Sequence, residues 1–161
     1  MKRLFFVLLF FGALLLVSCQ DKYGILDYQD KDITAECIVN EKFKIKIEKN
    51  EALCKITVSE PKNMNGVSFE IGERVYVIFG DTKIEVERED LGGICALAEI
   101  FSQSEDCLTT AKAQGQGSVL TFQKETCTYQ ITLGEHSLPK SVKILSEAFE
   151  YNVEICAIEL K

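Results

Sequence analysis

The chain has 161 residues, with 18 basic and 25 acidic side chains and a net charge of −7. This length suits one domain that can bury a real hydrophobic core. An acidic protein is repelled by nucleic acid and by anionic lipid head groups, so the charge argues against nucleic acid as a partner.

The chain begins with the basic segment Met1–Arg3, followed by 14 residues without a polar side chain, residues 4–17. This run is shorter than the roughly 20 residues that a transmembrane helix needs, and its length is typical of the apolar region of a secretory signal. It ends in Leu16-Val17-Ser18-Cys19, which resembles the bacterial lipobox. The resemblance implies cleavage before Cys19 and attachment of a diacylglyceryl group to that residue. The alternative is a plain signal peptide in which the cysteine is incidental.

Removal of the predicted signal peptide, residues 1–18, would leave 16 basic and 25 acidic side chains, a net charge of −9. Lipid, with acyl chains such as palmitate, would then hold the protein on the extracytoplasmic face of the cell membrane, because two chains anchor a protein stably. Residues 19–30 are largely polar and are predicted to form the lipidated N-terminus and a tether. Residues 31–161 are predicted to form a single β-rich domain.

From residue 31 onward, apolar residues recur at every second position, which is the period of a half-buried strand. The alternation is clear over Ile33–Val39, Phe43–Ile47 and Ala52–Val58, and turn-forming residues separate these segments. We expect these three strands to form a meander. The further predicted strands are Val67–Glu70, Arg74–Phe79, Thr82–Arg88, Cys107–Ala113, Ser118–Gln123, Cys127–Leu133, Lys140–Ser146 and Tyr151–Ile158.

One segment has a helical period instead. Ile94, Leu97 and Phe101 are spaced by three and four residues, which predicts a helix over residues 92–103. The predicted fold class is therefore mainly β (α+β), a curved antiparallel sheet or half-barrel of about eleven strands with one packed helix. A sheet that is apolar on one face must cover that face with a second sheet, a helix or a ligand. Ile94, Leu97 and Phe101 are thus candidate ligand-binding residues, and the alternative is that they are packed core.

Six cysteines remain besides Cys19, and the two nearest in sequence are twelve residues apart. No C-x-x-C spacing occurs, which argues against a thioredoxin-like site or a zinc ribbon. In the predicted meander, Cys37 and Cys54 would lie two strands apart, about 9.6 Å, and a disulfide needs Cα atoms within about 7 Å. Cys107 and Cys127 flank another strand in the same way. We interpret the cysteines mostly as free core thiols, and three disulfides are the alternative for a secreted chain.

The sequence indicates no catalytic site, no metal site and no cofactor. His136 is the single histidine and lies in a predicted turn, which argues against a Ser-His-Asp triad or a metal centre. Leu91-Gly92-Gly93-Ile94 lacks the Lys-Ser/Thr of a phosphate-binding loop. The alternating charges at Glu85 and Glu87, and at Lys42, Lys44 and Lys46, are interpreted as solvated strand faces. The protein is therefore not expected to be an enzyme.

Three segments match known family motifs. Ser59-Glu60-Pro61 followed by Met64–Phe69 forms a strand, turn and strand, Arg74–Arg88 forms the next hairpin, and Tyr129–Leu133 precedes Leu138-Pro139 and a late strand. In these features the domain resembles the bacterial lipoprotein-carrier superfamily, which includes the periplasmic lipoprotein carrier and the outer-membrane lipoprotein receptor. The resemblance implies an antiparallel half-barrel with helices in its concave face. This chain is shorter than typical carriers, has one predicted helix and carries its own lipid.

These features lead to two functional hypotheses. The first is a membrane-anchored surface lipoprotein that binds an acyl chain, a lipoprotein or another apolar ligand in the concave face of its sheet. The second is a structural or protein-interaction lipoprotein whose core is filled by its own side chains. An internal cavity with an apolar lining would favour the first hypothesis, and the sequence identifies no protein partner.

Overall fold

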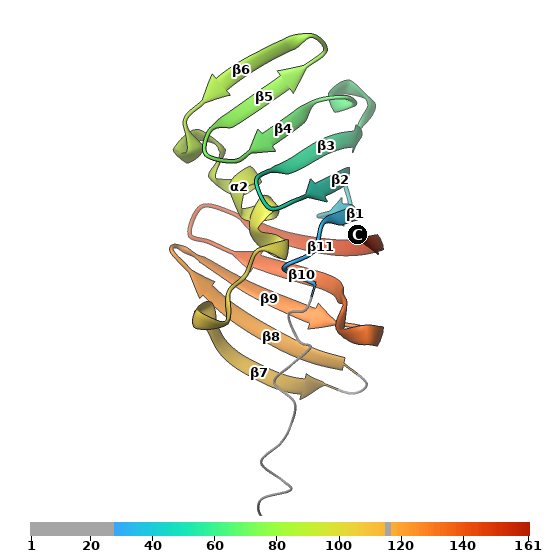
Figure 1. The fold of residues 1–161 in the computed structure, drawn as a ribbon, viewed down its shortest axis with the longest axis vertical. Helices are drawn as coiled ribbons and strands as arrows, with labels where there is room; N and C mark the ends of the chain where they lie inside the picture. Colours follow the sequence, from blue (N-terminus) through green and yellow to red (C-terminus); the bar gives the residue numbers. More distant parts are fainter. Residues whose placement is uncertain (1–27, 115–116) are drawn as a thin grey trace, which may run out of the picture.

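In a computed structural model, which describes residues 28–114 and 117–161, the chain forms an antiparallel sheet of eleven strands (Figure 1). The strand order is β6-β5-β4-β3-β2-β1-β11-β10-β9-β8-β7, so β6 and β7 are the edges of an open sheet. The predicted fold class and the meander of the first three strands are confirmed. The strands are β1 (Ile33–Val39), β2 (Phe43–Lys49), β3 (Cys54–Glu60), β4 (Ser68–Ile71), β5 (Val75–Phe79), β6 (Thr82–Val86), β7 (Leu108–Gln114), β8 (Gly117–Lys124), β9 (Cys127–Leu133), β10 (Pro139–Leu145) and β11 (Glu150–Leu160).

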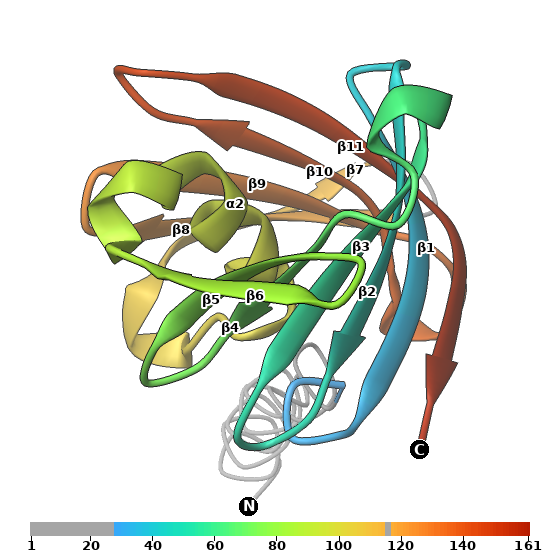
Figure 2. The ribbon, with the colours of Figure 1, turned by 90° about the horizontal axis from the view of Figure 1, so that it is seen from above.

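The alternation seen in the sequence places one apolar face of the sheet on its concave side. In β1, Ile33, Ala35, Cys37 and Val39 are buried, and the residues between them are partly or fully exposed. Successive side chains of a strand point to opposite faces, so this pattern needs no special turn or bulge. Viewed from above, the sheet curves around the helix α2 (Gly92–Ala98) (Figure 2).

The sheet consists of two meanders that meet in its middle. Strands β1 to β6 lead to one edge, the chain crosses the concave face, and β7 to β11 lead back until β11 pairs with β1. Asn40, in the β1–β2 turn, ties the two meanders together. Its side-chain oxygen accepts a hydrogen bond from the amide of Asn152 at 2.7 Å, and its amide group donates to the carbonyl of Glu150 at 3.2 Å.

The segment that crosses the concave face, residues 87–107, is called the crossing segment. It contains the predicted helix, but the α-helix is shorter than residues 92–103. A 3-10 turn over Arg88–Leu91 precedes α2, and a second 3-10 turn over Glu99–Phe101 follows it. Ser102 has left the helical region, with φ −133° and ψ 35°. The side chain of Gln103 then donates to the carbonyl of Glu99 at 2.7 Å, a bond that a continuing helix would make from a backbone amide.

Short 3-10 turns also occur at Lys62–Met64 and Glu105–Cys107. Glu135–Ser137 is a turn in which His136 has a left-handed backbone, with φ 56° and ψ 26°. None of the helices in the described residues is both long and apolar enough to cross a membrane.

The packed part of the chain includes Tyr28, which the sequence placed in the tether. Its side chain is 2% exposed and lies edge-on to the ring of Phe101, with the ring centroids 6.4 Å apart. The predicted signal peptide and Cys19 lie outside the described residues, so their acylation stays a prediction.

The six cysteines of the described residues are free thiols, as expected from the strand spacing. Strand β2 separates Cys37 from Cys54, and both are buried together with Cys95. Cys107 and Cys127 are half-buried, and Cys156 is exposed. Cys156 is exposed because the β1–β11 register shifts there: Cys37 pairs with Ile155, and Glu36 pairs with Ala157.

Candidate functional site

An apolar cavity of about 200 Å³ lies on the concave side of the sheet, between α2 and strands β1 to β4. Six of its lining side chains are buried and form its walls. Four others are half-buried and mark the rim, where the cavity approaches the surface. The buried residues are Val39, Ile45, Ile56, Val58, Phe69 and Leu97, and the rim residues are Phe43, Met64, Ile94 and Tyr151.

The walls of the cavity follow from strand register. Ile45 of β2 pairs with Val58 of β3, and Ile56 of β3 pairs with Phe69 of β4, so these side chains lie side by side on the concave face. Ile94 and Leu97 are three residues apart in α2, which places them on one helical face. The helix therefore closes the cavity opposite the sheet.

Tyr151 of β11 completes the rim because the helix begins with glycines. A Cβ atom at Gly93 would clash with the Tyr151 hydroxyl, so the close approach of the ring to α2 requires glycine at this position. The ring of Tyr151 also stacks on Phe149, with centroids 5.0 Å apart. Burial raises the pKa of Tyr151, which keeps its hydroxyl neutral.

This lining suits an uncharged apolar group. Among the ten lining side chains, the Tyr151 hydroxyl is the one oxygen, and none carries a charge. Larger hollows of about 550 and 470 Å³ elsewhere have mixed linings, which include Lys49 and Glu99 in the first and Lys143 and Glu154 in the second. The apolar cavity is therefore chemically distinct from the other hollows.

The structure brings together two of the three candidate ligand-binding residues. Ile94 and Leu97 line the cavity. Phe101 is not among the lining residues: it is 0% exposed and packs against Tyr28. The aromatic residues Phe69 and Tyr151 were not predicted from the sequence, although both fall on the alternating apolar phase of their strands.

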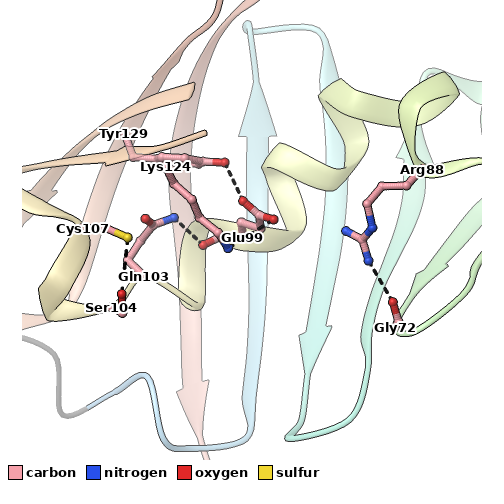
Figure 3. Close-up of polar contacts among 8 residues, drawn as sticks. All are labelled: Gly72, Arg88, Glu99, Gln103, Ser104, Cys107, Lys124 and Tyr129. Atoms are coloured by element: carbon pink, nitrogen blue, oxygen red, sulfur yellow. Dashed lines mark hydrogen bonds and ion pairs between the residues drawn. The ribbon is translucent and has the colours of Figure 1, made fainter. Parts of the chain in front are cut away.

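Polar contacts attach the crossing segment to both halves of the sheet (Figure 3). On one side, the Arg88 guanidinium donates to the carbonyl of Gly72 at 2.8 Å. On the other, Glu99 accepts a hydrogen bond from the Tyr129 hydroxyl at 3.1 Å and forms an ion pair with Lys124 at 3.3 Å. Burial and the charge of Glu99 raise the pKa of Tyr129, so it remains a hydrogen-bond donor.

The polar residues considered in the sequence lie in an exposed turn and on the outer face of the sheet. Within residues 28–114 and 117–161, no group of three His, Cys, Asp or Glu side chains is placed to hold a metal ion. His136 is exposed in a turn, as predicted. Lys44 and Lys46 form exposed ion pairs of 2.7 Å with Glu60 and Glu48, which agrees with a solvated outer face.

The described residues form an open antiparallel half-barrel with one α-helix in its concave face. No family model and no curated protein sequence matches the chain. Among solved structures, an uncharacterised conserved protein of Thermus thermophilus has a TM-score of 0.54 at 11% identity, covering 89% of this chain and 88% of that one. This likeness shows a shared fold.

Two further similar structures have lower TM-scores. A LolA superfamily protein of Nitrosomonas europaea has a TM-score of 0.40 at 7% identity, with 85% of this chain and 92% of that one covered. A Vibrio parahaemolyticus domain named for outer membrane lipoprotein sorting has a TM-score of 0.48 at 9% identity, with 88% and 90% covered.

Proposed function

We propose that the protein is a lipoprotein, anchored through Cys19 to the extracytoplasmic face of the membrane, that binds an acyl chain or the acylated end of another lipoprotein. The observation that supports ligand binding is the apolar cavity beneath α2, which has walls of six buried apolar side chains and a rim of four half-buried side chains. Protein interiors are packed with few voids larger than a water molecule. A cavity of about 200 Å³ in so small a core is therefore better explained as a binding site than as packing.

The size of the cavity sets the expected affinity. A cavity of about 150 Å³ holds benzene, a molecule of six carbons, so about 200 Å³ holds roughly eight carbons. At about 0.8 kcal/mol for each buried methylene, eight carbons supply roughly 6 kcal/mol before the costs of binding. We therefore expect octanoate to bind in the range of tens of micromolar or weaker.

The test uses residues 19–161 carrying Cys19→Ser, which retain every strand and every buried side chain that the structure describes. Octanoate is titrated by displacement of bound anilinonaphthalene sulfonate, an anionic dye that fluoresces in apolar surroundings. Val39→Phe projects a larger side chain into the cavity and should weaken octanoate binding at least tenfold. Ile38→Phe is the matched control, since Ile38 lies next to Val39 in β1 on the opposite face, and it should bind like the wild type.

The outcome distinguishes the two hypotheses. Octanoate binding that is lost in Val39→Phe and retained in Ile38→Phe supports a ligand site in the cavity. A folded wild-type protein that takes up neither the probe nor octanoate would instead support the structural or protein-interaction alternative.

A further inference from the structure

The hairpin of β5 and β6 carries two large apolar side chains that are exposed. Phe79 is 64% exposed and Ile84 is 55% exposed, and both belong to the apolar phase of their strands. Val75 is buried and Val77 half-buried in the same phase of β5, so Phe79 lies on the concave face with them. Ile84 pairs with Val77 and therefore shares that face. We call Val77, Phe79 and Ile84 the apolar strip.

The apolar strip is continuous with the wall of the cavity. Phe69, a wall residue on β4, pairs with Val77 of β5, and Val77 pairs with Ile84 of β6. Directly paired side chains lie about 5 Å apart, so the three form an unbroken row. The rim residue Met64 belongs to the connection that leads from β3 into β4. In Figure 1 the hairpin forms the upper edge of the sheet, beyond α2.

The opposite edge of the sheet shows that an uncovered edge need not be apolar. At the edge strand β7, residues 109–113 (TTAKA) are exposed and carry small or charged side chains. Exposed edge strands are usually protected from unwanted contacts by such residues. The edge next to the cavity instead carries Phe79 and Ile84, and this difference indicates a binding surface.

We infer that the apolar strip is the second part of the ligand site and holds the distal part of acyl chains longer than about eight carbons. This inference rests on the proposed function. A cavity of about 200 Å³ is too small for a long acyl chain, so the remaining methylenes must leave it. The row from Phe69 through Val77 to Ile84 is an apolar surface continuous with the cavity wall. The ligand class is therefore a long-chain acyl group, such as the one that a lipoprotein carries.

The test compares two chain lengths in the same protein, residues 19–161 with Cys19→Ser. A methylene that lies on the strip keeps one side in water, so each should raise affinity about twofold. The wild type should bind dodecanoate at least about tenfold more tightly than octanoate. In the double variant Phe79→Ser and Ile84→Ser, this ratio should fall to about threefold or less, while octanoate affinity stays unchanged.

Ile78→Ser is the matched control, because Ile78 lies between Val77 and Phe79 in β5 and points to the convex face. It should keep the tenfold ratio.

The single variant Ile84→Ser provides a second test should the double variant fold poorly, and it should lower the ratio at least twofold. An unchanged ratio in both strip variants would overturn the inference even if octanoate binds. The same conclusion would follow if sedimentation showed that the strip variants abolish a wild-type dimer and leave the ratio unchanged. Absence of octanoate binding in the wild type would instead reject the proposed function.

Discussion

Replacing Phe101 with alanine should destabilise the fold strongly without affecting the ligand site. The ring is 0% exposed and does not line the apolar cavity. Removal of a buried phenylalanine side chain costs about 3–5 kcal/mol of unfolding free energy. For a domain of this size, each kcal/mol lowers the melting temperature by roughly 3–5 °C, so we expect a loss of about 9–25 °C.

The edge-on contact with Tyr28 accounts for part of that cost. Such aromatic pairs contribute about 0.5–1.5 kcal/mol beyond the area that they bury. In a double-mutant cycle of Phe101→Ala with Tyr28→Leu, the two changes should therefore couple by about that amount. The coupling would also establish that Tyr28 belongs to the folded domain rather than to the tether.

The measurement combines thermal unfolding, followed by circular dichroism, with octanoate titration. Leu97→Ala is the matched comparison, because Leu97 is similarly buried and lines the cavity. It should cost about 2–5 kcal/mol and also change octanoate affinity several-fold. A cost below about 1.5 kcal/mol for Phe101→Ala, or an effect on octanoate binding as large as that of Leu97→Ala, would contradict a purely structural role of Phe101.

Three further predictions concern lipidation, thiols and the attachment of α2. Cys19→Ala in the full chain should abolish incorporation of labelled fatty acid, and Cys156→Ala should not; labelling that persists in the first variant would contradict the lipobox assignment. Burial raises the pKa of Cys37 to about 12 from 9.0. The contribution of the buried thiol to the free energy of unfolding is therefore fully present below about pH 9, and it is lost as the pH rises through about 12. Iodoacetamide at pH 9 should therefore modify exposed Cys156 far faster than Cys37 in the native protein, as measured by peptide mass spectrometry, and equal rates would exclude the buried thiol. Tyr129→Phe removes the hydrogen bond to Glu99 and should cost about 1.5–3 kcal/mol in denaturant unfolding, whereas an unchanged midpoint would show that the bond is not stabilising.

The sequence was sufficient to predict the elements because the strands are one-sided. Alternation over Ile33–Val39 is a local signal, and it matches the observed strand residue for residue. The helix start at residue 92 was predicted correctly by the same kind of signal, but its end at Ala98 was not. That end depends on Ser102 leaving the helical region and on the Gln103 side chain, neither of which changes the apolar period.

The site was predicted only in part because it depends on contacts between distant segments. Tyr151 reaches the cavity only because β11 pairs with β1, more than 100 residues earlier in the chain. Alternation of apolar residues within a strand does not indicate which other strand lies beside it. Likewise, Ile84 has the same local pattern as buried Ile56. Their exposure differs because Ile56 lies beneath α2, whereas Ile84 lies on the edge strand β6. The position of each strand in the sheet follows from the strand order and not from the local sequence pattern.

The strand order also explains why part of the apolar face of this half-barrel is uncovered. Because β6 and β7 lie at opposite edges, the connection between them must cross one face of the sheet, and it crosses the concave one. Eleven strands at about 4.8 Å spacing span roughly 48 Å, whereas the seven residues of α2 extend only about 10 Å. One short helix can therefore cover only the middle of the apolar face. The uncovered part must be polar, as it is along β7, or be filled by something other than the crossing segment, and Phe79 and Ile84 remain exposed on the other side.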